Sequence, residues 1–187
     1  MRLYALCDQQ LLDIKGVSLE EFIALSIENK AEIIQYRNKN GDIAFIKQQL
    51  IAIRKLYDGF LIVNDNYELI EFCDGVHVGQ EDLQKIDLDT TKAVKILRHV
   101  IGNDKILGIS THNKSEVELA NNMDLNYIGL GPFRSTTTKT NLEPSLGKQL
   151  DEIAAISKHF VAAIGGVKKT DNFKYVTYHV IASGLFE

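Results

Sequence analysis

Short runs of apolar and β-branched residues recur along the whole chain and alternate with amphipathic stretches. The runs occupy residues 3–7, 32–37, 60–65, 74–79, 105–111, 126–131, 160–166 and 175–182. Apolar residues recur at helical spacing in 18–30, 42–57, 91–101, 114–123 and 147–159. Strand followed by helix, repeated, predicts a parallel sheet. Eight strands in one domain favour closure over a doubly wound sheet, so we expect an α/β fold, a single (β/α)8 TIM barrel over residues 1–187.

Composition limits the classes of function. With 187 residues and 45% hydrophobic composition, the chain can build one domain with a sizeable core. Its net charge of −4 is spread over interleaved acidic and basic residues, which argues against general nucleic-acid or membrane-surface binding. No apolar run approaches a membrane span and no secretory signal opens the chain, so we expect a cytoplasmic protein. Cys7 and Cys73 stand in or beside apolar runs and are interpreted as reduced core thiols.

Unusual polar residues gather where the predicted strands end. They include Gln35, Arg37, Lys39, Asn64, Asp65, Asp82, Ser110, Thr136, Thr138, Lys139, Gly165, Gly166 and Ser183. In a parallel barrel the carboxyl ends of all strands lie on one face, where such barrels place their active sites. The pattern therefore predicts one polar site at that face.

Three cations in this set predict an anion site. Arg37 and Lys39 are two residues apart and point the same way if strand geometry persists. Together with Lys139 they would place three positive charges at the end of the barrel where the strands terminate. These charges would repel one another unless an anion binds between them, and a polyphosphate suits that arrangement. The alternative is a set of solvated loop charges.

Asp65 and Asp82 lie one strand–helix unit apart, so their carboxylates can converge. Carboxylates beside a phosphate site suit Mg²⁺, which completes its shell from phosphates and water. A general acid–base pair, or two aspartates that cap turns, are the alternatives.

Gly165 and Gly166 follow the seventh predicted strand. Paired glycines let a phosphate approach backbone N–H groups, although a simple turn also uses them. For His112 and His77 we favour structural roles, because His77 alternates with Val76 and Val78. The histidine spacing does not favour zinc.

With these residues in hand, the chain resembles the thiamine-phosphate synthase family over nearly its whole length. The motifs are QYRNK (35–39), IVND (62–65), DGVHVGQEDL (74–83), GISTH (108–112), YIGLGP (127–132), TTTK (136–139) and AIGG (163–166). The resemblance implies a transferase that couples hydroxymethylpyrimidine pyrophosphate to thiazole phosphate, giving thiamine phosphate and pyrophosphate. It also implies Mg²⁺ and a dissociative mechanism through a pyrimidine carbocation.

The resemblance also implies residue roles. Asp65 and Asp82 would hold Mg²⁺, and Arg37, Lys39, Asn64 and Lys139 would bind the pyrophosphate. Gln35 and Ser110 would lie near the pyrimidine, and Thr136 and Thr138 would line the thiazole side. Gly165, Gly166 and Ser183 would contribute to binding thiazole phosphate. Lys139, Ser110 and Arg37 are the expected catalytic residues.

The chain departs from the family pattern in several places. Asn66 replaces an arginine, and Arg134 and Ser135 replace an apolar residue and a proline. Only eight residues separate Gly166 from Tyr175, too few for a βαβ crossover, so we expect the seventh helix to be missing or a turn. The sequence stops three residues after Gly184, so we also expect the final helix to be absent. Ala182 is an equally plausible match for the family serine that we assign to Ser183.

Lost outer helices predict uncovered apolar surface and hence a homo-oligomer, a dimer in its simplest form. Two other functions stay open. One is a thiazole tautomerase-like isomerase, against which the retained Asp65, Asp82, Lys39 and Lys139 argue. The other is a non-catalytic barrel that binds thiamine precursors.

Overall fold

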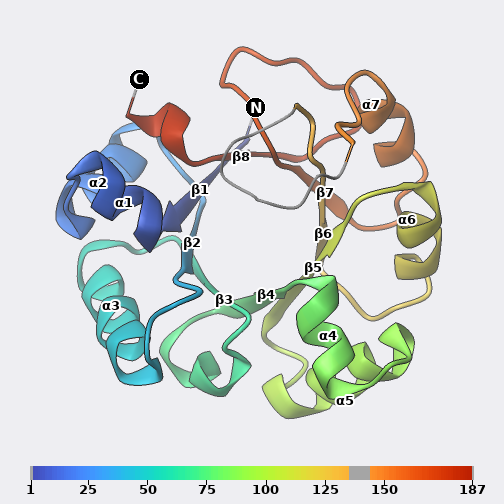
Figure 1. The fold of residues 1–187 in the computed structure, drawn as a ribbon, viewed down its shortest axis with the longest axis horizontal. Helices are drawn as coiled ribbons and strands as arrows, with labels where there is room; N and C mark the ends of the chain where they lie inside the picture. Colours follow the sequence, from blue (N-terminus) through green and yellow to red (C-terminus); the bar gives the residue numbers. More distant parts are fainter. Residues whose placement is uncertain (1, 135–143, 187) are drawn as a thin grey trace.

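The protein is a closed barrel of eight parallel strands in sequential order, each paired with its neighbours along the chain and β8 paired with β1 (Figure 1). The computed structural model describes residues 2–134 and 144–186. The strands are β1 (Arg2–Asp8), β2 (Ile33–Arg37), β3 (Phe60–Asn64), β4 (Gly75–Val78), β5 (Ile106–Thr111), β6 (Tyr127–Leu130), β7 (Phe160–Ala163) and β8 (Tyr178–Ile181). All eight predicted strands and the barrel are confirmed.

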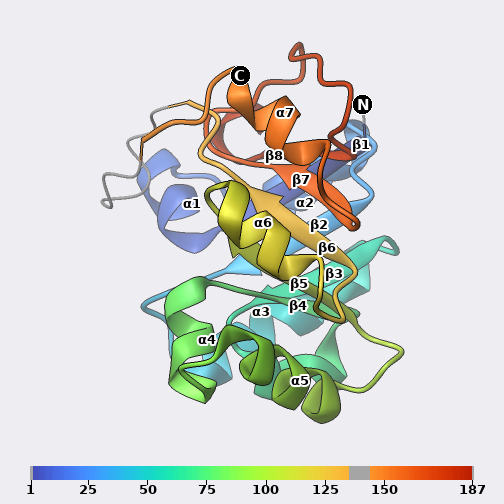
Figure 2. The same cartoon turned by 90° about the vertical axis from the view of Figure 1, so that its right-hand side faces the viewer.

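Helices surround the barrel on its outside (Figures 1 and 2). They are α1 (Gln9–Lys15), α2 (Leu19–Glu28), α3 (Ile43–Leu56), α4 (Gln80–Ile86), α5 (Thr90–Ile101), α6 (Lys114–Ala120) and α7 (Gln149–Ala154), with 3-10 turns η1 (Tyr67–Phe72) and η2 (Ser183–Leu185). The capping box of Ser18 and Glu21 starts α2 as predicted. Asp42, Asp89 and Asn113 also accept backbone N–H groups at helix starts. Two helices of seven residues each, α1 and α4, were not predicted.

The core has two layers separated by the sheet. Leu3, Ala5 and Cys7 of β1 point outward into the layer between sheet and helices, and both cysteines are buried and unpaired with each other, as predicted. Tyr4 points inward and belongs to an interior cluster. That cluster consists of Tyr4, Ile33, Ile62, Tyr127, Ala162, Tyr178 and Val180, all from strands. The barrel is therefore filled by side chains rather than open.

No helix follows β7 in the described residues. An extended loop, at the top of Figure 1, connects β7 to β8. Val167, Phe173 and Val176 of this loop pack against the outer core, and His179 of β8 is 4% exposed. The missing helix after β7 is confirmed. The loop covers part of the outer surface of these strands, but Phe160 and Tyr175 are 59% and 47% exposed, so apolar side chains remain uncovered at this place.

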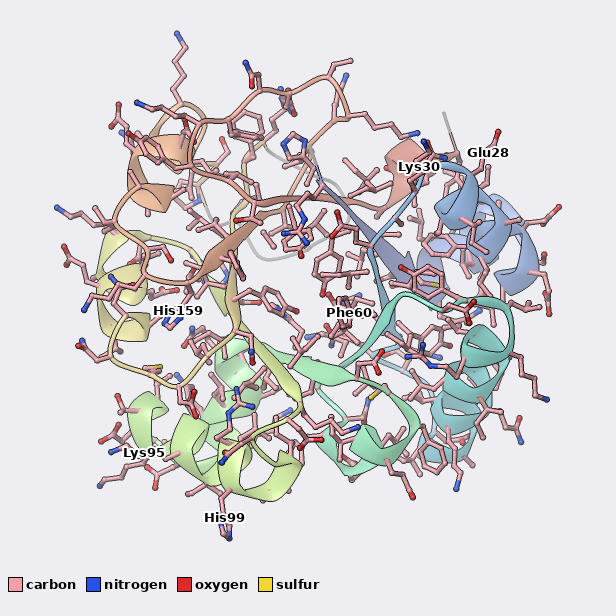
Figure 3. All side chains as sticks on the ribbon, turned by 180° about the vertical axis from the view of Figure 1, so that it is seen from behind. Glu28, Lys30, Phe60, Lys95, His99 and His159 are labelled. Atoms are coloured by element: carbon pink, nitrogen blue, oxygen red, sulfur yellow. The ribbon has the colours of Figure 1, made fainter. Side chains whose placement is uncertain are left out.

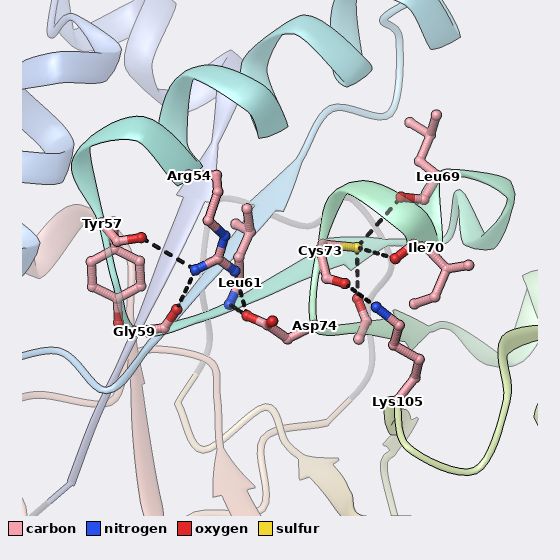
Figure 4. Close-up of polar contacts among 10 residues, drawn as sticks. Arg54, Tyr57, Gly59, Leu61, Leu69, Ile70, Cys73, Asp74 and Lys105 are labelled. Atoms are coloured by element: carbon pink, nitrogen blue, oxygen red, sulfur yellow. Dashed lines mark hydrogen bonds and ion pairs between the residues drawn. The ribbon is translucent and has the colours of Figure 1, made fainter.

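The amino ends of the strands are tied by a separate polar cluster (Figure 4). Arg54 pairs with Asp74 and donates to the carbonyls of Tyr57 and Gly59, and Asp74 also accepts the Leu61 N–H. Phe60 lies near the centre of the ring seen from behind (Figure 3) and is 50% exposed. This face is the end of the barrel opposite the predicted site.

Candidate active site

The residues predicted for the site lie at the carboxyl ends of the strands. Gln35, Asn64 and Ser110 are in the last part of β2, β3 and β5, and Asp65 follows β3 directly. Asp82 lies in the first turn of α4, after β4. Thr136, Thr138 and Lys139 lie outside the described residues, so their predicted roles stay predictions.

Asp65 and Asp82 converge on Gly79. The Gly79 N–H donates to Oδ1 of Asp65 at 3.2 Å, and a Cβ added to Gly79 would lie 3.4 Å from Oδ2 of Asp82. Burial and the nearby charge of Asp82 raise the pKa of Asp65, against the opposing effects of the Gly79 N–H, Lys39 and Arg37. Asp65 also has a φ of 64°, a left-handed conformation that few non-glycine residues adopt. Two acidic groups are thus held close together at an energetic cost.

This donor set fits a magnesium ion that shares its coordination shell with a substrate. The described residues contain no group of three or more His, Cys, Asp or Glu side chains placed to hold a metal by themselves. Mg²⁺ commonly takes one or two carboxylates and completes its shell from phosphate and water. Lys85 lies 2.5 Å from Asp82 and supplies a counter-charge that we did not predict.

Arg37 and Lys39 lie at and just after the carboxyl end of β2, but their surroundings differ. Arg37 pairs with Asp8, which is buried at the end of β1 and also accepts the Leu11 N–H at the start of α1. Lys39 is exposed, and its charge acts on Asp65. The prediction of three free cations missed Asp8, which fixes Arg37 and neutralises part of its charge.

A continuous chain of hydrogen bonds crosses the barrel interior from Asp65 to Ser110. Its links are Asp65 to Asn64, Asn64 to Gln35 (2.7 Å), Gln35 to Tyr4 (2.7 Å), Tyr4 to Tyr127 (2.8 Å), Tyr127 to His77 (3.0 Å) and His77 to Ser110 (3.0 Å). Burial raises the pKa of both tyrosines, which keeps the phenols protonated. The chain therefore connects six strands, and its two phenols are neutral.

The charge of Asp65 sets the direction of every bond in this chain. An ionised carboxylate only accepts, so Asn64 donates its amide to Asp65 and accepts from Gln35. Gln35 then accepts from Tyr4, which accepts from Tyr127. Tyr127 then accepts from Nδ1 of His77, and in a neutral imidazole with its proton on Nδ1, Nε2 accepts the Ser110 hydroxyl proton. The lone pairs of Ser110 Oγ are left for a donor on a ligand.

Sequence reasoning missed three members of this chain. Tyr4 and Tyr127 were read as parts of apolar strands. His77 was interpreted as structural, although its alternation with Val76 and Val78 indicates that its side chain points to the opposite side of the strand from theirs. In a closed barrel whose valines face the helices, the residue between them must face the interior. His112, in contrast, bonds Glu116 at the start of α6, which fits the structural role expected for it.

Gly165 and Gly166 form a turn at the end of β7 with φ of 86° and 67°. These values favour glycine, as a backbone approach site requires. Ser183 is the first residue of the turn η2, two residues after Ile181 at the end of β8, and it is exposed. The choice between Ser183 and Ala182 as the residue nearest a ligand stays open.

The fold and these residues define a class: a (β/α)8 barrel with carboxylates, cations and paired glycines at the carboxyl ends of its strands. Comparison with known proteins narrows the class. The model of the family described as thiamine monophosphate synthase matches residues 3–182. The chain therefore belongs to the thiamine monophosphate synthase family, as the sequence motifs indicated.

Individual relatives agree. The chain is 33% identical over 174 residues to a thiamine-phosphate synthase of Persephonella marina, covering 90% of this chain and 78% of the relative. It is 36% identical over 184 residues to one of Lawsonia intracellularis, covering 95% and 79%. A thiamine phosphate pyrophosphorylase from Pyrococcus furiosus has the same fold, with a TM-score of 0.76, 23% identity, and coverage of 97% of this chain and 85% of that one.

Proposed function

We propose that this protein couples hydroxymethylpyrimidine pyrophosphate to thiazole phosphate, forming thiamine phosphate and releasing pyrophosphate. The observation that carries the proposal is the convergence of Asp65 and Asp82 on Gly79 beside Lys39 and Arg37, in a chain of this family. Carboxylates that repel one another in the free protein are suited to a site completed by a metal-bound pyrophosphate. The reaction would take place in the cytoplasm.

In the proposed reaction, the bond between the pyrimidine methylene carbon and the pyrophosphate oxygen breaks, and its electron pair leaves with pyrophosphate. The thiazole nitrogen then donates its lone pair to the resulting carbocation, forming the new carbon–nitrogen bond. When bound by Asp65 and Asp82, Mg²⁺ would neutralise charge that develops on the leaving group.

The protein's own groups would bind and orient. Lys39, Arg37 and the Asn64 amide would face the leaving pyrophosphate, with Lys139 assigned the same task by its motif. Gln35 and Ser110, whose bond directions are fixed by the interior chain, would orient the pyrimidine. Filling of the barrel below them by Tyr4 and Tyr127 would exclude water from the cation.

The direct test is to incubate pure protein with both substrates and Mg²⁺ and to measure thiamine phosphate by chromatography. Asp65→Asn and Asp82→Asn should each lower kcat/KM by at least about a hundredfold, the scale for loss of a group that stabilises transition-state charge. Glu81→Gln is the matched control, because Glu81 shares the first turn of α4 with Asp82 but is exposed.

The outcomes separate the candidate functions. Product that survives both aspartate substitutions would overturn the metal assignment. Isomerisation of a thiazole phosphate without Mg²⁺ would favour the tautomerase. Magnesium-dependent pyrophosphate binding without product would favour a binding protein.

The dimer also stays a prediction. The loop between β7 and β8 buries Val161, Ala163 and Ile181 but leaves Phe160 and Tyr175 exposed, so part of the apolar surface on which the prediction rests is present. Light scattering at micromolar concentration decides between monomer and dimer.

A further inference from the structure

Arg134, which departs from the family pattern, ties the ends of β6 and β7 together. Its guanidinium donates to both carboxylate oxygens of Asp171 at 2.7 and 2.6 Å and to the carbonyl of Gly166 at 2.6 Å. The guanidinium also lies 4.3 Å from the centre of the Phe133 ring. One side chain thus joins the segment after β6 to the segment that replaces the seventh helix.

Backbone bonds run beside this contact. The N–H of Phe133 donates to the carbonyl of Ile164, and the N–H of Arg134 donates to the carbonyl of Gly165, both at 2.8 Å. With the bond from the Arg134 side chain to Gly166, three successive carbonyls, those of residues 164 to 166, point toward residues 133 and 134.

This arrangement fixes where the neighbouring N–H groups point. In a trans peptide the carbonyl and the following N–H point in opposite directions. The N–H groups of Gly165, Gly166 and Val167 are therefore turned away from residues 133 and 134, and they donate to no acceptor within the described ranges. Successive backbone N–H groups without internal partners are a common anion site.

Asp171 is the acidic partner of Arg134 in this contact. Its carboxylate accepts the Lys168 N–H at 2.7 Å, which closes the loop just after the glycines. The Arg134 bond lowers the pKa of Asp171, so the pair is charged at neutral pH. The paired guanidinium offsets a negative charge that would otherwise stand unpaired near an anion.

The geometry points to Arg134 and Asp171 as positioning residues for the phosphate group of the thiazole substrate, an inference that rests on the proposed function. Arg134 directs the carbonyl of Gly166 away from the phosphate and leaves the three N–H groups to receive it. Asp171 fixes the guanidinium in that position. The pair does the positioning that a helix after β7 would otherwise support.

The test compares Arg134→Met, Arg134→Lys and Asp171→Asn with the wild type. For Arg134→Met, KM for thiazole phosphate should rise about tenfold, equivalent to about 1.4 kcal/mol, while KM for the pyrimidine pyrophosphate stays unchanged. Arg134→Lys keeps the charge but loses the planar fork, so it should restore only part of the affinity. Asp171→Asn keeps an acceptor for Lys168 and should raise KM less than Arg134→Met.

Arg2→Met is the matched control. Arg2 makes the same kind of forked pair, with Glu32, and lies 4.5 Å from the Tyr178 ring, but at the opposite end of the barrel. It should leave both KM values unchanged. Thermal unfolding of each variant checks that the fold is intact, and Arg134→Lys with Asp171→Asn carry the test if Arg134→Met does not fold.

Calorimetric titration with thiazole phosphate separates this inference from the proposed function. An inactive wild type that binds thiazole phosphate in an Arg134-dependent way would overturn the function and support the inference. An active wild type whose KM for thiazole phosphate does not respond to Arg134→Met, or responds equally for both substrates, would overturn the inference alone. A wild type that neither reacts nor binds would overturn both.

Discussion

Asp65 and Ser110 stand at the two ends of one directed chain of hydrogen bonds, although they belong to segments after β3 and at the end of β5. Because Asp65 only accepts when ionised, it fixes the donor and acceptor roles of Asn64, Gln35, Tyr4 and Tyr127 and favours a proton on Nδ1 of His77. Asp65, which we assign to the metal, thereby determines how Ser110, which we assign to the pyrimidine, presents its hydroxyl oxygen. The two halves of the candidate site are coupled before any substrate enters.

Tyr127→Phe tests this coupling at the middle of the chain. The substitution keeps the ring, which stacks on His77, but removes the bonds to Tyr4 and His77. Without the phenol, His77 loses its bond to Tyr127, and the chain between Tyr4 and His77 is interrupted. We expect kcat/KM to fall about tenfold and the free energy of unfolding to fall by about 1–3 kcal/mol, the range for leaving buried polar partners unsatisfied. Steady-state kinetics and urea denaturation measure the two effects.

Tyr178→Phe is the control for this substitution. Tyr178 lies inside the barrel, with its ring 6.4 Å from that of Tyr4, but its hydroxyl is not part of the chain. Its kcat/KM should match the wild type. An equal loss in both variants would mean that the effect comes from the barrel interior in general.

Asp65→Asn should make the free protein more stable while it lowers kcat/KM. The substitution removes the charge that burial and Asp82 disfavour, and asparagine tolerates the left-handed backbone at this position. The gain should be up to about 1 kcal/mol, or about 2–4 °C in Tm for a chain of this size. Differential scanning calorimetry without magnesium measures it. A lower Tm than that of the wild type would mean that the bonds from Gly79 and Asn64 outweigh the repulsion.

The order of strands and the main helices was accessible from sequence because each is a local pattern. The run at 60–65 is apolar, and the capping box of Ser18 and Glu21 is a local motif. The covering of β8 was not accessible. It depends on Phe173 packing against His179, a contact between segments that share no periodicity.

The candidate site shows the same division. Asp65, Asp82 and Gly166 follow strands, and position and motif were enough to predict them as site residues. Asp8 was missed because a single aspartate after an apolar strand resembles a helix cap, and it does cap α1. Its second role is to pair with Arg37. That role follows only from the parallel register of β1 and β2, which places Asp8 beside Arg37.

Arg98→Met should lower stability without changing substrate affinity. Arg98 is 7% exposed, and its guanidinium lies at the amino ends of β5 and β6, opposite the carboxyl ends where the candidate site lies. It donates to the carbonyls of Gly102, Lys105 and Asp124 and to Oδ1 of Asn126. Losing these charged donors should reduce the free energy of unfolding by about 3 kcal/mol. Urea denaturation measures the loss, and both KM values should stay at wild-type levels; a shift in KM would show that the two ends of the barrel are coupled.

His179 should make stability depend on pH below neutrality. Burial lowers the pKa of His179 below its ordinary value of 6.5, despite the opposing effects of the Lys168 carbonyl and Asp171. As the pH falls through 6.5 toward the folded-state pKa, the unfolded chain takes up a proton that the folded chain does not. The free energy of unfolding therefore decreases in this window, by at most about 1.4 kcal/mol per pH unit for one group.

His179→Gln keeps a donor for the Lys168 carbonyl but cannot titrate, so this part of the pH dependence should disappear. Urea denaturation of the wild type and the variant between pH 5 and pH 8 provides the comparison. The difference at pH 8, where the imidazole is neutral in both states, gives the contribution of packing and hydrogen bonding and is subtracted at each lower pH. Parallel profiles for the two proteins would contradict the assignment, because the slope would then arise from other titrating groups.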